Sequence, residues 1–576
     1  MPKRWVLRHC DEEKAASLAD KLSISPITAQ VLIHRGLHSA DDARSFLQPE
    51  LSLLSEPDLL PDIDAAVLRI HDAVIKKEKI LIYGDYDVDG ITCTALLLHF
   101  FRLLNADAEF YIPHRVDEGY GLNLDAIDQF KQRRVDLVIT VDCGVTSCRE
   151  VAAAQDAGID MIITDHHEPG IELPPACAVV NPKLTQSKCS FREFSGVGVA
   201  FKLCWAVAKR FSPGKRVTPE FRQFLIDSMA LVALGTIADV VPLKDENRVL
   251  AKYGLQALSA TKCEGLKALL SISGLEGKRL SARNVSFGIA PRLNAAGRLS
   301  QASLGVELLT TDSKQRAMEL AEILDKHNRQ RQKVQSNILK SAREMLEADS
   351  NLAQAPAIVL ASEDWHAGVI GIVASRIAEE YNRPTVMIAL DGDMGKGSAR
   401  SIPGFHLYDA IKQCEDLLLA FGGHVGAAGL SVESKNIPAL REKLAQVTAA
   451  SLKKDDFQPS VEIDADILLS MLSRKLIDEF ENLEPFGESN PPPVLAASNL
   501  SVAGLPRLMG AKGQHVSFIV RQGDTSVRAV GFGMGDLYDQ ISECSDTCHI
   551  AFAPRLNCYN GNESVELEIH DLRVDE

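Results

Sequence analysis

The stretch that decides the fold is Lys79-Ile80-Leu81-Ile82-Tyr83-Gly84-Asp85-Tyr86-Asp87-Val88-Asp89-Gly90-Ile91. It opens with a short apolar run of the kind that forms a buried strand. It continues as an acidic loop and then enters an apolar helix from Ile91. A strand that feeds a helix in this way is the building unit of an α/β sheet.

The same alternation continues along the chain. It predicts further strands at 108–113, 135–141, 160–164 and 178–181, with helices at 123–133, 147–157, 197–211 and 220–237. Buried, β-branched strands separated by helices indicate a parallel sheet that is covered on both faces.

The rest of the chain changes character three times. Residues 1–50 resemble a set of short helices, and 312–350 lacks breakers and predicts one long linking helix. A smaller α/β pattern follows, with strands at 357–360 and 385–390 and helices at 369–380 and 407–419. Short runs at 515–520, 526–532, 550–554 and 564–569 predict a small β-barrel. We therefore expect an α/β multidomain protein divided at 1–50, 51–311, 312–350, 351–453 and 454–576.

The bulk composition is that of a globular protein, with 576 residues, 46% hydrophobic and 24% charged. No apolar run approaches the roughly 18 residues of a membrane span, and Asp11 to Lys14 are charged where a signal peptide would be apolar. We expect a cytoplasmic protein with no membrane contact and with reduced thiols at its 12 cysteines. The net charge of −16 argues against a general nucleic-acid coat protein, so DNA contacts would be local basic patches.

Metal-ligand residues gather at the predicted strand ends. In an extended loop Asp85, Asp87 and Asp89 would share one face. Asp142 follows a second strand, and Asp165-His166-His167 follow a third. Carboxyl ends of parallel strands meet at one edge, where ligands bind in open α/β sheets.

Asp239 adds a further acid inside an apolar helix-to-strand run, where an unpaired carboxylate is costly. Taken alone, the acidic loop is equally compatible with a solvated turn. An EF-hand does not fit, because Ile91 to Phe101 contains no Glu. Together, carboxylates and imidazoles suit two divalent ions, with Mn²⁺ favoured by the histidines and Mg²⁺ as the alternative. Such a pair activates water for phosphodiester hydrolysis.

These motifs resemble the DHH phosphoesterase superfamily and, within it, the RecJ family of single-stranded-DNA-specific exonucleases. Further matching stretches are Tyr120-Gly121-Leu122, 196–201, 291–298, 365–371, 397–401 and 422–429. The resemblance spans roughly residues 30 to 575 and implies a DHH domain, a DHHA1 domain and an OB-like barrel.

The resemblance also implies roles for individual residues. Asp85, Asp87 and Asp142 would hold one ion, and Asp89, His166 and Asp239 the other, with Asp142 shared. Asp165 would orient a histidine, and His167 would face the scissile phosphate. Substrate would be bound by Arg115, Arg298, Ser398, Arg400, Gly422, Gly423 and His424.

The function implied is 5′→3′ hydrolysis of single-stranded DNA to mononucleotides in repair and recombination, with single-strand-binding protein and a helicase as partners. His515, Phe518 and Tyr559 are candidates for stacking on bases, but they fit a core equally well. Three alternatives remain: a phosphodiesterase for short RNAs or cyclic dinucleotides, a non-enzymatic DNA-binding scaffold and an inorganic pyrophosphatase. The 120 or so residues after 455 and the complete ligand set argue against them.

Overall fold

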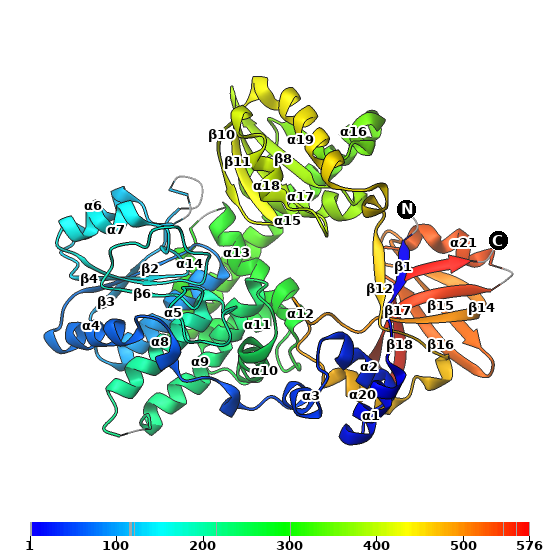
Figure 1. Cartoon of the computed structure of the whole chain (residues 1–576), viewed down its shortest axis with the longest axis horizontal. Helices are drawn as coiled ribbons and strands as arrows, with labels where there is room; N and C mark the ends of the chain where they lie inside the picture. Colours follow the sequence, from blue (N-terminus) through cyan, green and yellow to red (C-terminus); the bar gives the residue numbers. More distant parts are fainter. Residues whose placement is uncertain are drawn as a thin grey trace. The chain divides into compact units, whose positions relative to one another are not determined.

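The structure is a computed structural model and describes residues 3–114, 118–119, 121–214, 216–299, 301–544, 547–559 and 562–574 (Figure 1). The chain divides into two compact units. The first comprises Ser55–Val241 and Tyr253–Gln458, and the second comprises Met1–Leu54, Pro242–Lys252 and Pro459–Glu576.

A five-stranded parallel sheet organises the first half of the larger unit, with strand order β3-β2-β4-β5-β6. The strands are β2 (Ile80–Gly84), β3 (Ala108–Tyr111), β4 (Leu137–Val141), β5 (Asp160–Thr164) and β6 (Ala178–Val180). Every residue of β2 and β4 is buried, as the continuous apolar runs predict.

Helices cover both faces of this sheet (Figure 1). On one face α6 (Leu124–Gln132) and α7 (Cys148–Asp156) pack over Tyr83, Val138 and Met161. The other helices are α4 (Ile63–Lys76), α5 (Val88–Leu103), α8 (Gly196–Arg210) and α9 (Pro219–Ala238). The doubly covered parallel sheet is therefore confirmed.

Among the described residues, α9 alone is long and apolar enough to cross a membrane. Of the most apolar segment of this helix, 61% is buried inside the protein, as in a core helix.

A helical region joins this sheet to the next. It contains α11 (Glu264–Ile272), α12 (Ala282–Asn284), a π-helical turn (Val285–Ile289), α13 (Ala290–Leu299) and α14 (Ser303–Thr310). It ends in the 35-residue helix α15 (Lys314–Ala348), which the Ser313 hydroxyl caps by accepting from the Arg316 amide. The expected long helix is confirmed, since no Gly or Pro interrupts it.

A second sheet follows with order β10-β11-β9-β8-β7. Its strands are β7 (Ile358–Ser362), β8 (Thr385–Asp391), β9 (Met394–Arg400), β10 (Leu418–Gly423) and β11 (Ala427–Glu433), and its helices are α17 (Ala367–Tyr381), α18 (Leu407–Lys412) and α19 (Ile437–Ser451). The helix expected over 407–419 is wrong in its second half. It ends at Lys412, and the apolar residues from Leu418 pair with β11, because sheet pairing overrides local helical preference.

The smaller unit contains a closed five-stranded barrel. Its strands are β14 (Leu495–Met509), β15 (His515–Gln522), β16 (Thr525–Gly531), β17 (Cys548–Tyr559) and β18 (Asn562–Val574). They pair in the order β14-β15-β16-β18-β17, and β17 pairs with β14 to close the barrel. The expected C-terminal barrel is confirmed.

The N-terminal segment belongs to this same unit. Its helices α1 (Glu12–Leu22), α2 (Pro26–His34) and α3 (Ala40–Leu47) share one apolar core with the barrel, where Leu18 and Leu32 join Leu495 and Phe552. Strand β1 (Arg4–Leu7) pairs in parallel with β12 (Ser460–Ile463). Nothing in residues 1–50 alone reveals this partner.

Candidate metal centre

The acidic loop after β2 is built partly as a helix cap. Asp87 is the N-cap of α5, and its Oδ1 accepts the amides of Asp89 (2.9 Å) and Gly90 (3.2 Å). The extended-loop expectation is therefore wrong for Asp89, which lies in the first turn of the helix. A carboxylate in this turn also interacts favourably with the helix dipole.

Asp142 and the histidine pair stand at neighbouring strand ends. Asp142 follows β4 in a left-handed conformation (φ 63°), which is uncommon for a non-glycine residue, and its amide donates to Thr164 O. Asp165, His166 and His167 follow β5. A left-handed backbone such as that of Asp142 is frequent at functional sites.

Asp239 reaches the same place from a different element. It is the C-cap of α9, and the next element is helix α10 (Asp245–Ser259), so the expected helix-to-strand passage is wrong. The next residue, Val240, also has positive φ (61°) and is 63% exposed.

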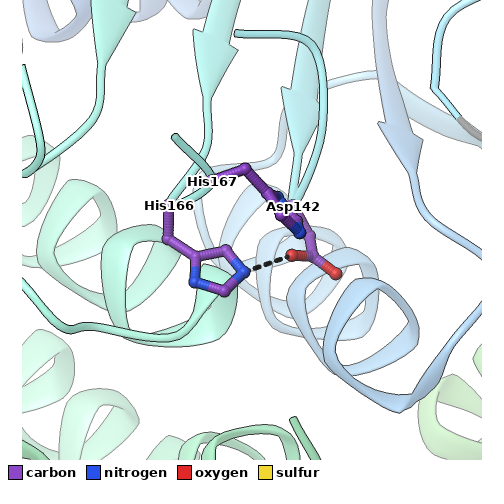
Figure 2. Close-up of side chains that lie close together, drawn as sticks. All are labelled: Asp142, His166 and His167. Carbon is purple, nitrogen blue, oxygen red and sulfur yellow. Dashed lines mark ion pairs between the residues drawn. The ribbon is translucent and has the colours of Figure 1, made fainter. Parts of the chain in front are cut away.

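The side chains from these four places converge. Three groups each have ligand atoms within 4.8 Å of one another, namely Asp85/Asp87/Asp142, Asp89/His166/Asp239 and Asp142/His166/His167. His166 Nε2 lies 3.1 Å from Asp142 Oδ1 and 3.6 Å from Asp239 Oδ2. Figure 2 shows His166 and Asp142 directed at each other from neighbouring strand ends.

The protein alone does not balance the charge of this cluster. Burial, and then the charge of Asp87, raises the pKa of Asp89 to about 7. Burial and neighbouring aspartates, Asp89 foremost, raise the pKa values of Asp142 and Asp239 well above normal. Burial, and then His167, lowers the pKa of His166 to about 3, so this imidazole is neutral and able to bind a metal.

The donor set fits divalent cations. Asp142 Oδ1, His166 Nε2 and Asp239 Oδ2 are buried and make no hydrogen bond within the described part of the chain. Buried polar atoms of this kind normally have a partner. Carboxylate oxygens with one or two imidazole nitrogens are ligands for Mg²⁺ or Mn²⁺.

Two glycines make room for the carboxylates. The first two amides of α8, Gly196 N and Val197 N, donate to the Asp89 carboxylate at 2.6 and 2.9 Å. A Cβ on Gly196 would lie 2.7 Å from Asp142 Cβ, and one on Gly235 would lie 2.6 Å from Asp89 Oδ1. Gly196 lies in one of the family-like stretches of the sequence, whereas no sequence motif includes Gly235.

Asp165 holds the histidine pair in place. Its carboxylate accepts from His167 Nδ1 (2.7 Å) and from the amides of His166, His167 and Val145. Burial opposes its ionisation, but the hydrogen bond and charge of His167 outweigh burial and lower the pKa of Asp165. Asn181, fully buried, donates to His167 O (2.9 Å), a role that no motif in the sequence indicates.

The expected substrate residues of the second sheet lie on β9, β10 and the following turn. Ser398 and Arg400 share one face of β9, and Arg400 Nη1 lies 3.1 Å from Ser398 Oγ. Burial, and then the charges of Arg400 and His167, lower the pKa of His424. Charges of both the second sheet and the histidine pair therefore act on His424.

The two glycines of this region differ. Gly423 has φ 149°, and its Cβ would lie 2.4 Å from Ala427 O, so a side chain is excluded there. A Cβ on Gly422 would meet nothing within 4 Å.

The other two arginines expected to bind substrate differ in what the structure describes. Arg298 donates to Gly368 O at 2.9 Å. Arg115 lies outside the described residues.

The barrel exposes a different aromatic side chain from the expected ones. Phe518 is only 4% exposed, so it belongs to the core, and the side chain of Tyr559 lies outside the described residues. His515 is half-buried and packs on Phe532, which is 41% exposed. Phe532 lines a 610 Å³ cavity with Arg528 and Arg555, and the Arg555 guanidinium lies 5.0 Å from its ring centre.

Comparisons with known proteins agree with this arrangement. Three family models match: the N-terminal domain of the DHH family at 79–236, the DHHA1 domain at 354–450 and the RecJ OB domain at 463–571. These segments fall inside the ranges 51–311, 351–453 and 454–576, whose boundaries remain predictions.

Curated relatives span the whole chain. The single-stranded-DNA-specific exonuclease RecJ of Bacillus subtilis is 39% identical over 575 residues, covering 100% of this chain and 71% of that protein. The Escherichia coli protein of the same name is 32% identical, covering 99% of this chain and 100% of its own length.

Solved structures give the same result. Thermus thermophilus RecJ in complex with Mn²⁺ superposes with a TM-score of 0.84 at 32% identity, covering 100% of this chain and 80% of that one. Its complex with Mg²⁺ gives 0.78 at 31% identity, covering 100% and 79%. With its three domains and its acidic metal-binding cluster, this chain belongs to the RecJ family of single-stranded-DNA-specific exonucleases.

Proposed function

We propose that this enzyme hydrolyses single-stranded DNA from the 5′ end and releases 5′-mononucleotides, with two divalent ions bound at the cluster. The observation that carries the proposal is the convergence of three ligand groups, each within 4.8 Å, at one edge of the sheet. One group suffices for one ion, and several overlapping groups support a pair.

The ligands divide by their grouping. Asp85, Asp87 and Asp142 would hold one ion, and Asp89, His166 and Asp239 would hold the other; Asp142 also groups with His166 and His167. The imidazole of His166 favours Mn²⁺, and Mg²⁺ is the alternative. When bound, such ions lower the pKa of water and offset charge on the phosphate.

His167 faces the scissile phosphate, and Asp165 orients its ring by accepting the Nδ1 proton. In the imidazolium form, Nε2 of His167 then donates a hydrogen bond to a phosphate oxygen. Water adds to phosphorus, and the bond to the 3′ oxygen of the terminal nucleotide breaks. That nucleotide leaves with a 3′ hydroxyl, and the shortened strand keeps a new 5′-phosphate.

The terminal 5′-phosphate binds at the second sheet. Arg400 offers a forked donor beside the Ser398 hydroxyl, and His424 lies near both Arg400 and His167. The open space over Gly422 and the turn at Gly423 admit the phosphate. We assign Arg115 and Arg298 to the same substrate path.

The barrel binds the single strand as well. Phe532 presents an exposed aromatic face on which a base can stack, next to Arg528 and Arg555, whose guanidinium groups pair with Glu566. In the cell we propose a cytoplasmic role in DNA repair and recombination, together with single-strand-binding protein and a helicase.

The test is digestion of 50-nucleotide single strands labelled at the 5′ or the 3′ end, with Mn²⁺, Mg²⁺ or chelator. We expect early release of the 5′ label as a mononucleotide, Mn²⁺ at least as effective as Mg²⁺, and no digestion with chelator. Early release of the 3′ label would refute the polarity. Faster hydrolysis of cyclic or linear dinucleotides than of long strands would favour a dinucleotide phosphodiesterase.

A further inference from the structure

A cavity of 180 Å³ lies beside the metal centre, outside the residues assigned so far except Arg298. The end of α9 forms one wall with Ile237, Ala238 and Val240, the immediate neighbours of Asp239. The remaining lining residues are Ser286, Ala290, Pro291, Asn294, Arg298, Arg331 and Ile372. This lining contains two arginines and no acid.

Arg331 is held in place by neutral groups. Its Nη1 donates to Gln335 Oε1 (3.1 Å) and its Nη2 to Asn328 Oδ1 (2.7 Å), both on the same helix α15. Its Nε is buried and makes no hydrogen bond, and no ion pair joins Arg331 to an acid of the described part. Burial, and then the charge of Arg376, lower its pKa.

A half-buried guanidinium without an opposite charge is costly to the fold. Natural proteins retain such a group where a bound anion supplies the missing charge, and arginine favours phosphate because its planar fork matches the oxygens. The exposed Arg376 adds positive charge nearby. The electrostatics of the cavity therefore suit an anion.

A second part of the lining is one face of a continuous helical run. Ser286, Ala290, Asn294 and Arg298 are spaced by four, which places them on the same side from the π-helical turn through α13. Arg298 is fixed by its hydrogen bond to Gly368 O. This face brings a hydroxyl, an amide and a second guanidinium to the cavity that Arg331 enters.

The first turns of α17 separate this cavity from the one that contains Ser398. Ile372 lines the cavity of Arg331, whereas Gly368 and Ile370 line a cavity of 410 Å³ with Ser398. If the terminal phosphate occupies the Ser398 side, the cavity beside Asp239 is available to the part of the strand beyond the cut.

We propose that this cavity binds the phosphodiester immediately 3′ of the scissile one, with Arg331 and Arg298 contacting its oxygens. The proposal rests on the proposed function and extends it to a named subsite. The volume is below the roughly 300 Å³ at which whole-ligand sites begin, and it suits one phosphate with its sugar. The enzyme would then gain affinity from the third nucleotide onward.

The test compares substrates that do and do not have this phosphate. A 5′-phosphorylated dinucleotide contains only the scissile phosphodiester, and a trinucleotide adds the next. For Arg331→Gln we expect KM on the trinucleotide and longer strands to rise about tenfold with little change in kcat. Hydrolysis of the dinucleotide should stay within about twofold of wild type.

The matched control is Lys340→Gln, which removes a positive charge from an exposed position of the same helix (side chain 78% exposed) and should leave all substrates unchanged. A second measurement uses only the wild-type enzyme. A neutral methylphosphonate at the phosphate after the scissile one should weaken its binding about tenfold.

Equal losses on dinucleotide and longer strands would overturn the subsite, because Arg331 would then act on folding or on the metal centre. Indifference of the wild-type enzyme to the methylphosphonate would overturn it as well. In both cases the wild-type enzyme remains an active 5′→3′ nuclease. An inactive wild-type enzyme, or 3′→5′ digestion, would instead contradict the proposed function.

Discussion

Gly235 leaves the space that the Asp89 carboxylate of the metal site occupies. A methyl group there would lie 2.4 Å from Thr92 Oγ1 and 2.6 Å from Asp89 Oδ1. We predict that Gly235→Ala displaces the Asp89 carboxylate and weakens Mn²⁺ binding by ~10–100-fold, as displacement of supporting groups around a metal does. Calorimetric titration with Mn²⁺ measures the change.

The control is Gly214→Ala, since a Cβ at Gly214 meets nothing within 4 Å. Wild-type Mn²⁺ affinity in Gly235→Ala would show that the carboxylate tolerates the displacement.

The sequence predicts the acids and histidines of the site because strand ends in a parallel sheet meet at one edge. It does not reveal Gly235, Asn181 or the amide of Val145, since these act through contacts between segments distant in the chain. The stacking role considered for Phe518 fails for a related reason: an aromatic residue in a strand fits a core and a binding face equally well, and its burial decides.

At the scale of elements, a buried ion pair links α15 to α13. Asp325, whose side chain is 6% exposed, accepts from Arg292 Nε at 2.9 Å and also pairs with Arg329. We predict that Asp325→Ala lowers the free energy of unfolding by about 3 kcal/mol, because it leaves the partly buried Arg292 without its carboxylate partner. Urea denaturation of the full chain measures the loss.

The exposed Glu319 on the same helix pairs with Arg316, and Glu319→Ala should cost at most about 1 kcal/mol. Equal costs for the two variants would mean that the Asp325 pair contributes no more than a surface pair.

Strands and helices with strong periodicity are predictable within a residue or two, as β5 and α9 show. The region 407–419 is not, because an apolar run next to a short helix resembles its continuation. Only pairing with β11 makes Leu418–Gly423 a strand. Likewise, α5 begins at Val88 because Asp87 caps it. The expectation of an extended loop from Asp85 to Asp89 did not include this cap.

At the scale of the whole molecule, divalent ions should stabilise the fold. The cluster buries acids whose mutual repulsion raises their pKa values, and bound cations relieve it. We predict that Mn²⁺ at a hundred times its Kd stabilises the folded state by about 2.7 kcal/mol and that chelator reverses this. Thermal unfolding with Mn²⁺ and with chelator measures it, and an unchanged Tm would show that the folded protein binds no Mn²⁺.

The N-terminal segment should be required for the barrel. Leu18 and Leu32 are buried in the core shared with the barrel, and the Glu479 carboxylate accepts from Thr28 Oγ1 and Ser25 N. We predict that removal of residues 1–50 exposes this core and causes aggregation, which light scattering and dye binding would detect. A monomeric truncated protein with the wild-type Tm would contradict the shared core.

The central claim is that the converging acids and histidines form a metal-dependent nuclease centre, and Asp142→Ala tests it most directly, because Asp142 belongs to two of the three ligand groups. The measurement is the rate of mononucleotide release from 5′-phosphorylated single strands with saturating Mn²⁺. The control is Asp160→Asn. Asp160 begins β5, whereas the histidine pair of the metal centre follows the other end of this strand. We predict a loss on the order of 10³-fold for Asp142→Ala and a wild-type rate for the control. A wild-type rate in Asp142→Ala would contradict the account.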